Sequence, residues 1–306
     1  MDPDHRKKKR IRSIRRCFYE FSHIRCGKIR AGGADIFYRE AGREDAPVIV
    51  LFHGFPTASY MFSDLMPILA EKYHVIAPDY PGFGESEMVP RDKFAYTFDH
   101  LASVMDDFLT RMHVKKFAMY IFDYGAPIGM RIACKHPDRI TAIISQNGNV
   151  YEEGLGEKWK ARAAYRAHPT EELRESFKSA FRAPAVTAQY MGGEAEGSVL
   201  PDHYTLDLYY MSREGEDEIQ SDLIYDYRTN VAFYPTFQKY LRTYQPPLLA
   251  IWGKNDVSFI PAGAKAFQKD LPNAVIRLLD AGHFALETHS REIGNKILQF
   301  LAKENI

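Results

Sequence analysis

The sequence predicts an α/β protein with a mostly parallel eight-stranded sheet, helices on both faces and an inserted helical cap. In residues 17–149, short apolar runs alternate with amphipathic segments, the order that a parallel sheet with crossover helices requires. Residues 150–245 are helix-like, rich in tyrosine and poor in strands, and strand character returns in residues 246–306. We therefore expect one core, formed by residues 17–149 and 246–306, with residues 150–245 inserted as a cap.

The first half of the core begins with two strands, in IRCGKIRAGG and ADIFYREAG, joined by a Gly-Gly turn. Continuous apolar runs then predict strands that are buried on both faces, in APVIVLFHG, YHVIAPDY, KKFAMYIF and ITAIISQNG. Helices fit SYMFSDLMPILAEK and TFDHLASVMDDFLTRMH. In the second of these helices the apolar side chains fall on one stripe, namely Phe98, Leu101, Met105, Phe108, Leu109 and Met112.

The second half of the core contributes two more strands, PPLLAIWG and AVIRLLD, and a closing helix, SREIGNKILQFLAK. These two strands are the seventh and eighth in chain order. The whole cap therefore lies between the sixth and the seventh strand.

Charge is unevenly distributed, although the formal net charge is zero. Eight Lys and Arg lie between Arg6 and Arg16, and without residues 1–16 the chain has 32 basic and 38 acidic side chains, a net charge of about −6. Such a body is not a nucleic-acid-binding surface. We interpret residues 1–16 as a basic, disordered head, because like charges repel; binding of phosphate, anionic lipid or a transport receptor is the alternative.

Compartment and partners follow from what the chain lacks. No long apolar segment follows the basic head, so we expect neither a secretory signal nor a membrane span. The three cysteines, Cys17, Cys26 and Cys134, show neither a disulfide framework nor metal-ligand spacing. We therefore expect a cytoplasmic protein without a metal or another cofactor; a homodimer is compatible with the sequence.

Reactive side chains follow four of the predicted strands. Residues 53–56 (HGFP) follow the third strand, Asp123 the fifth, Asp256 the seventh and His283 the eighth. Taken singly, each has a structural explanation, such as a helix cap or a turn. Since ligands of open α/β sheets bind at the carboxyl ends of the strands, we expect them to form one site. Their order, nucleophile, acid and histidine, is that of a hydrolytic triad.

The segment YIFDYGAPIGMRIACKHP combines a strand, a tight turn and a helix, as in a nucleophile elbow. Asp123 stands where a serine hydrolase has its serine, and no G-x-S-x-G motif occurs elsewhere in the chain. Asp123 is therefore the predicted nucleophile.

The chain resembles the α/β-hydrolase superfamily, and within it the branch of epoxide hydrolases and haloalkane dehalogenases. The resemblance runs from Gly27 to Leu301 and is carried by HGFPTASYMF, DYPGFGES, FDYGAPIG, GKNDVSFIPAG and DAGHFALETH. One departure is Ile121, at a position where the elbow usually has a small residue.

The resemblance implies a catalytic triad of Asp123, Asp256 and His283 that acts through an alkyl ester of Asp123 and needs only a small-molecule substrate and water. His283, oriented by Asp256, would activate water against the ester. The backbone N–H groups of Phe55 and Tyr124 would form the oxyanion hole.

The resemblance leaves two leaving groups open. Dehalogenases of this branch usually carry Trp after the nucleophile, where this chain has Tyr124, and only Trp159 could serve from the cap. Haloacetate dehalogenases place Arg after the nucleophile, which is absent here. Epoxide hydrolases supply two cap tyrosines as acids, for which Tyr227 in IYDYRTNVAF is the first candidate, Tyr190 in TAQYMGG the second and Tyr210 a fallback.

We therefore expect an epoxide hydrolase, with a haloalkane or haloacetate dehalogenase as the alternative. A catalytically idle binding protein of the same fold is the second alternative. Four further residues are expected to line the pocket or shape the cap hinge: His53, Pro56, Trp159 and Asn147.

Overall fold

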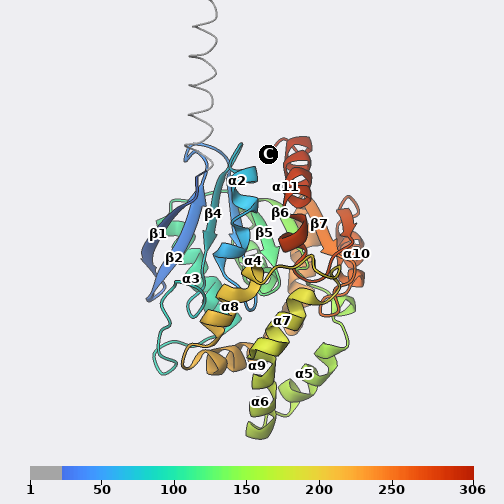
Figure 1. Ribbon diagram of the computed structural model, residues 1–306. Helices are drawn as coiled ribbons and strands as arrows, with labels where there is room; N and C mark the ends of the chain where they lie inside the picture. The colour runs from blue at the N-terminus through green and yellow to red at the C-terminus, as the bar shows by residue number, and fades with distance from the viewer. Residues whose placement is uncertain (1–22) are drawn as a thin grey trace, which may run out of the picture.

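The computed structural model describes residues 23–306, except for the side chains of residues 160, 161, 164 and 166. It confirms the predicted fold class: one sheet contains eight strands in the order β1-β2-β4-β3-β5-β6-β7-β8 (Figure 1). β1 pairs with β2, and β2 with β4, in antiparallel fashion, while all later neighbours are parallel. The basic head predicted at residues 1–16 lies outside the described residues.

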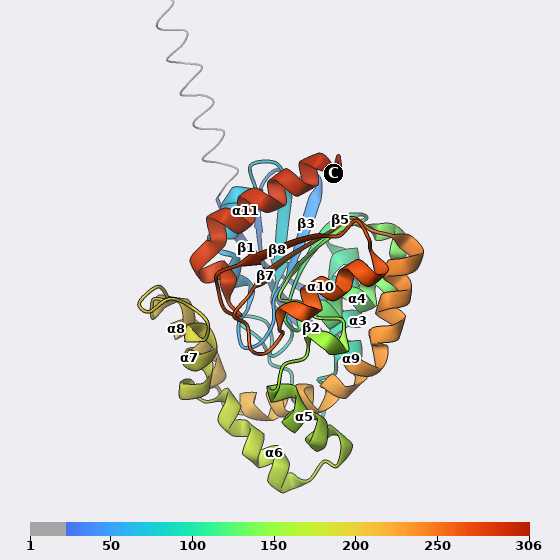
Figure 2. The ribbon, with the colours of Figure 1, turned by 90° about the vertical axis from the view of Figure 1, so that its right-hand side faces the viewer.

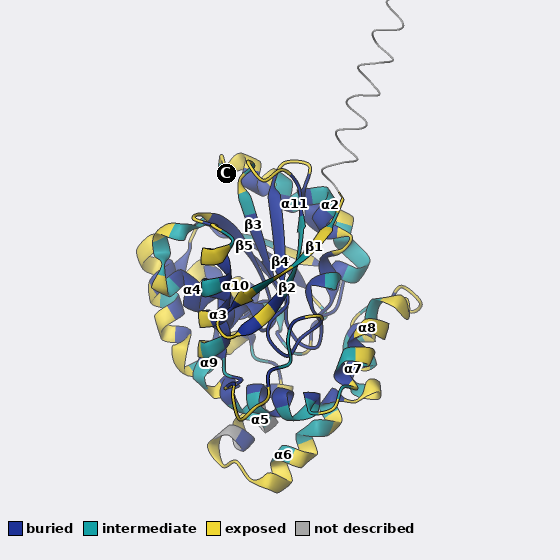
Figure 3. Cartoon of the chain, turned by 90° about the vertical axis from the view of Figure 1, so that its left-hand side faces the viewer, coloured by how far each residue is buried: buried dark blue, intermediate teal, exposed yellow. Residues whose placement is uncertain are grey.

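The strands occupy the predicted segments. Their bounds are β1 Arg25–Ala31, β2 Ala34–Ala41, β3 Val48–Phe52, β4 His74–Pro78, β5 Phe117–Phe122, β6 Ile140–Gln146, β7 Leu248–Gly253 and β8 Val275–Leu279. Because successive side chains of a strand point to opposite faces, β3 sends Val50 and Phe52 into one apolar cluster and Ile49 and Leu51 into the other. The central strands are thus buried on both faces (Figure 3).

Helices cover both faces of the sheet. The helices are α2 Leu65–Leu69 and α11 Ala285–Lys303, which contact each other on one face, and α3 Phe98–Arg111, α4 Gly125–Lys135 and α10 Pro261–Asp270 on the other. Figure 2 shows α11 and α10 on opposite sides of the strands. The helix α10 was not predicted.

The helix predicted for SYMFSDLMPILAEK is wrong in extent. The structure divides it into a 3₁₀ turn at Ser59–Phe62 and the short helix α2. Pro67 has no backbone N–H to donate to a preceding turn, and it stands in the first turn of α2, where no such donor is needed.

The cap consists of α5 Lys158–Ala167, α6 Glu171–Phe177, α7 Ala183–Met191, α8 Asp202–Met211 and α9 Glu216–Tyr244 (Figures 1 and 2). The helix α9 contacts α5 and α8 of the cap and also α3, α4 and α10 of the core. A single long helix therefore connects cap and core. Within residues 23–306, no helix has the length and apolar character needed to cross a membrane.

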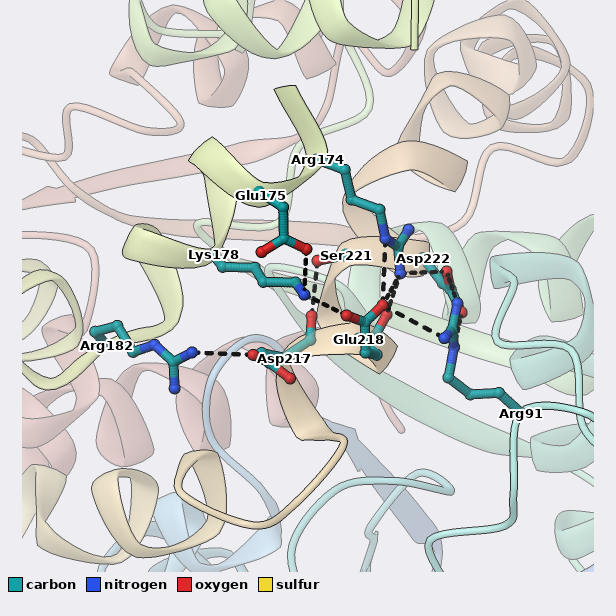
Figure 4. A network of polar contacts seen from close by, with 9 residues as sticks. All are labelled: Arg91, Arg174, Glu175, Lys178, Arg182, Asp217, Glu218, Ser221 and Asp222. Atoms are coloured by element: carbon teal, nitrogen blue, oxygen red, sulfur yellow. Dashed lines mark hydrogen bonds and ion pairs between the residues drawn. The ribbon is translucent and has the colours of Figure 1, made fainter. Parts of the chain in front are cut away.

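A network of charged side chains links cap helices to one another and to a core loop (Figure 4). Glu218 of α9 accepts hydrogen bonds from Arg174, at 2.6 Å, and from Lys178, and these cations lower the pKa of Glu218 to about 2. Arg91, from the loop before α3, donates to Asp222 of α9 at 2.6 Å. The network therefore links α6, the turn after it, α9 and a core loop.

Candidate active site

The elbow holds Asp123 in a strained backbone conformation. Asp123 lies between β5 and α4 with φ +47°, in the left-handed region that non-glycine residues rarely adopt. A Cβ atom on Gly54 would lie 2.3 Å from the Cβ of Asp123, and one on Gly125 would lie 2.3 Å from the carbonyl oxygen of Phe52. The turn is possible because glycine stands at both positions.

The bulky Ile121 is accommodated by a glycine one helical turn into α4. Ile121 is fully buried in β5, two residues before Asp123. A Cβ atom on Gly129 would lie 2.8 Å from Cγ2 of Ile121. The strand therefore carries a large residue where the elbow usually has a small one, and Gly129 in the facing helix leaves the room for it.

His283 lies between two carboxylates. Its Nδ1 is 2.7 Å from Oδ2 of Asp256, and its Nε2 is 3.7 Å from Oδ2 of Asp123. An ionised carboxylate only accepts hydrogen bonds, so Nδ1 carries the proton that is donated to Asp256. The Nε2 lone pair therefore faces Asp123, where a water molecule could lose a proton to it.

Asp256 is fixed by donors on both of its oxygens. Oδ1 accepts from the backbone N–H groups of Ser258, at 2.7 Å, and Phe259, at 3.1 Å. Oδ2 accepts from Asn147 Nδ2 at 2.7 Å as well as from His283. Asn147, predicted to lie at the cap hinge or in the pocket, thus orients Asp256.

One oxygen of Asp123 lies at the backbone N–H groups that were predicted to form an oxyanion hole. Oδ1 accepts the backbone N–H of Phe55 at 2.8 Å, and the backbone N–H of Tyr124 also donates to this carboxylate. Oδ2 remains on the side of His283. The two oxygens therefore differ: Oδ2 can attack an electrophile, while Oδ1 is held where negative charge would later develop.

Burial and neighbouring charges shift the pKa values of Asp123 and His283. Burial raises the pKa of Asp123. The charges of His283 and Arg162 and the two backbone N–H groups lower it, but burial has the larger effect. Burial lowers the pKa of His283, but Asp256 and Asp123 outweigh this effect, and the net pKa of His283 lies above its ordinary value of 6.5. Asp123 is 7% and His283 6% exposed, so solvent screens their interaction weakly.

An aromatic cluster contains two of the predicted residues, Tyr227 and Trp159. The ring of Tyr227, in α9, lies 4.2 Å from that of Trp159 and 6.2 Å from that of Tyr124. Asn149 Nδ2 donates to the Tyr234 hydroxyl at 3.4 Å, and that hydroxyl lies 3.3 Å from the hydroxyl of Tyr227. Either of the two hydroxyls can donate to the other.

The structure corrects two of the candidate proton donors. Tyr190 is fully buried, but its hydroxyl donates to Asp207 of α8, and its ring stacks on Phe284 at 3.8 Å. Tyr210 donates its hydroxyl to Glu85 at 2.5 Å and stacks against Tyr60. The Tyr190 hydroxyl joins two cap helices and the Tyr210 hydroxyl joins the cap to a core loop, and neither belongs to the cluster around Asp123.

His53 and Pro56 belong to the loop after β3. His53 is fully buried; its Nε2 accepts the backbone N–H of Tyr80 at 3.2 Å, so its Nδ1 is protonated and donates to the carbonyl of Gly54 at 3.1 Å. Burial lowers the pKa of His53 to about 3 and keeps it neutral. We assign His53 to positioning of the loop. Pro56 is buried and follows a cis peptide bond.

Sequence reasoning missed three features near Asp123. The hydroxyl of Tyr124 is buried and has no hydrogen-bond partner among the described residues. Lys158 and Arg162 of α5 are close enough for their charges to affect the pKa values of His283 and Asp123 respectively. The available signal was the spacing of four residues between two cations, which places them on one side of a helix.

No group of three or more His, Cys, Asp and Glu side chains in residues 23–306 is arranged to hold a metal ion.

Comparison with known proteins gives concordant results. A family model described as the alpha/beta hydrolase fold matches residues 47–290. An uncharacterized hydrolase of Saccharomyces cerevisiae, YNR064C, is 45% identical over 281 residues, which are 89% of this chain and 94% of the relative. A haloalkane dehalogenase of Psychrobacter cryohalolentis is 23% identical over 286 residues, 87% of each chain. The crystal structure of haloalkane dehalogenase DbeA from Bradyrhizobium elkani superimposes with a TM-score of 0.77 and 22% identity, covering 92% of this chain and 99% of that one.

Proposed function

The chain belongs to the alpha/beta hydrolase fold family, and from this premise we propose that it hydrolyses epoxides to diols through a covalent alkyl ester of Asp123. One observation carries the proposal. The residue at the elbow is a carboxylate whose Oδ2 lies 3.7 Å from a histidine that is itself held by Asp256 at 2.7 Å. Whereas serine must first lose a proton, an ionised carboxylate can attack a saturated carbon directly.

In the first step, Oδ2 of Asp123 bonds to a ring carbon of the epoxide while the bond between that carbon and the epoxide oxygen breaks. The departing oxygen takes a proton and becomes a hydroxyl group. Tyr227 and Tyr124 are the candidate donors, since burial raises the pKa of both phenols and keeps them protonated at neutral pH. We assign this role to Tyr124 in place of Tyr190, because the Tyr124 hydroxyl has no hydrogen-bond partner among the described residues, whereas that of Tyr190 donates to Asp207.

In the second step, Nε2 of His283 removes a proton from water, and the resulting hydroxide adds to Cγ of Asp123. The negative charge then develops on Oδ1, which already accepts the N–H of Phe55 at 2.8 Å. Cleavage of the bond between Cγ and Oδ2 releases the diol. His283 returns its proton to the departing alkoxide oxygen, and the new carboxyl group of Asp123 gives its proton to the tyrosinate. The sum is epoxide plus water to diol.

The pH dependence of kcat follows from the raised pKa of His283. His283 must be neutral to accept a proton, and Asp123, whose pKa is also raised, must be ionised. Acidification protonates both groups and thereby stops the reaction, so kcat rises with pH through an apparent pKa above 6.5. A kcat profile between about pH 5 and pH 9 measures this limb. A profile that is flat or falling across this window contradicts the assigned base.

Substitution of Asn147 tests the support of the triad acid. Asn147→Gly suits the φ of +49° at this position but removes the donor to Asp256. Because a hydrogen bond to a charged group contributes about 1.5–3 kcal/mol, we expect kcat to fall roughly 10- to 100-fold, with a displaced acidic limb. Asn230→Ala removes another buried asparagine, in α9, and serves as control: it should lower stability without moving the pH profile. If Asn147→Gly leaves the pH profile of kcat unchanged, Asn147 does not support Asp256 in catalysis.

A dehalogenase using the same triad is the second candidate function. Two observations favour it: the relatives described above include haloalkane dehalogenases, and Trp159 lies 4.2 Å from Tyr227. In a dehalogenase, the indole N–H of a tryptophan such as Trp159 would stabilise the departing halide. A phenol has the corresponding role in epoxide opening, where it protonates the departing oxygen.

Products decide between the candidates. Wild-type protein is incubated separately with styrene oxide and with 1-bromobutane, and diol formation and bromide release are followed, with Asp123→Asn as the blank. Diol from the epoxide supports the proposal. Bromide release without diol transfers the assignment to a dehalogenase. If a broad substrate series yields neither diol nor bromide, the result points to a binding protein.

Localisation in the cytoplasm is part of the proposal. Its support is that Cys26 and Cys134 are both free thiols, which suits a reducing compartment.

A further inference from the structure

We propose that Lys158 and Arg162 of α5 form an anion-binding subsite beside the catalytic pair, and that the substrate of this hydrolase carries a carboxylate. The identity of the reacting substrate rests on the proposed function, whereas the binding of a carboxylate at α5 does not.

The first argument is the position of the two cations. Lys158 and Arg162 are four residues apart in a helix and therefore lie on one side of it. The guanidinium of Arg162 lies 4.6 Å from the centre of the Trp159 ring. That ring is 5.3 Å from Phe259, which in turn lies 5.9 Å from His283. The aromatic cluster thus holds this side of α5 near the catalytic histidine.

The second argument is electrostatic proximity. Burial has the largest effect on the pKa of Asp123 and of Tyr124 and raises both, while the charge of Arg162 lowers them. For His283, burial is again the largest single influence, and it lowers the pKa. Asp256 and Asp123 together outweigh burial and raise the pKa, while the charge of Lys158 lowers it. Both cations therefore act on the residues that would carry out the reaction.

The third argument is that neither cation is paired with a carboxylate within the described residues. Arg174 and Lys178 of the cap each form an ion pair, as does Arg182 with Asp217. Lys158 and Arg162, by contrast, form no ion pair with a carboxylate of the described residues. An arginine that is free to present two parallel N–H donors fits a carboxylate.

The fourth argument concerns the charge of the nucleophile. An anionic substrate approaching Asp123 meets a carboxylate in a buried site, where repulsion between like charges is strong. The charge of Arg162, which acts on Asp123, and that of Lys158, which acts on His283, would offset this repulsion and attract anions toward the site. A neutral substrate would gain nothing from them.

The kinetic test uses two substrates of nearly the same shape, glycidate and glycidamide, which differ in carrying a carboxylate or an amide on the same epoxide. Arg162→Gln should lower kcat/KM for glycidate roughly 10- to 100-fold, the expected loss of a hydrogen bond between charged groups. It should change kcat/KM for glycidamide less than threefold, and Lys158→Gln should act in the same direction. Arg228→Gln, which removes another cap arginine stacked on a ring, is the matched control and should affect neither substrate. Equal losses for both substrates overturn the subsite.

A binding test remains decisive if neither epoxide is turned over. Propionate and propionamide are titrated into wild-type protein, and tryptophan fluorescence is followed. Trp159 contacts Arg162, whereas Trp252 is fully buried in β7 and provides a constant background. Saturable quenching by propionate, absent with propionamide and with Arg162→Gln, supports the subsite even if epoxide hydrolysis fails. An equal response to both ligands, or none to either, overturns it.

Discussion

Asp123→Asn will lower kcat by roughly 10⁴–10⁶-fold, the range seen when a nucleophile is removed. The amide has the same shape as the carboxylate and its oxygen can still accept the backbone N–H of Phe55, now 2.8 Å from Oδ1. It lacks the negative charge that attack on a saturated carbon requires. The measurement is product formation from an excess of epoxide, with intact mass used to verify that the asparagine has not been hydrolysed to aspartate.

A stability measurement separates loss of the nucleophile from loss of the fold. Burial raises the pKa of Asp123, so its ionised form is disfavoured in the folded protein. Removal of the charge should therefore leave the free energy of unfolding unchanged or raise it. Substantial residual turnover by a folded Asp123→Asn protein would mean that another group attacks the substrate.

His283→Gln will abolish turnover but leave the first step intact. In the structure, Nε2 of His283 faces Oδ2 of Asp123 at 3.7 Å without having to activate it. We expect multiple turnover to fall by roughly 10⁴-fold, because no group remains to remove a proton from water. The ester of Asp123 should accumulate to one equivalent per protein within a single turnover, as followed by rapid quenching and peptide analysis.

The comparison with a serine nucleophile makes this outcome diagnostic. A serine needs the histidine to lose its proton, so removal of the histidine would suppress both steps. If His283→Gln is folded and reacts in neither step, the histidine must take part in the first attack, and the mechanism proposed here is wrong.

The sequence predicted the fold class because strands buried on both faces appear as continuous apolar runs. It also predicted that Asp123, Asp256 and His283 would meet, since each follows a parallel strand, and these strand ends lie at one edge of the sheet. This prediction needed only strand order. The extent of the helix around Pro67 was missed, because its apolar pattern was given more weight than the missing N–H.

Residues in the cap were harder to place because their neighbours depend on how the cap packs against the core. Tyr190 and Tyr227 are both buried tyrosines on cap helices, yet one donates to Asp207 and the other lies beside Trp159. No local pattern separates them. Asn147 directly follows β6, but its role depends on the distance to Asp256, more than a hundred residues away in the chain.

The most direct test of the covalent mechanism is the mass of His283→Gln after incubation with styrene oxide. We expect the protein to gain the mass of one whole epoxide, and peptide mapping to place the adduct on Asp123. Alkaline hydroxylamine, which cleaves esters, should remove it. If the wild-type protein hydrolyses styrene oxide while the folded variant gains no mass, or gains it on a residue other than Asp123, the ester mechanism is contradicted.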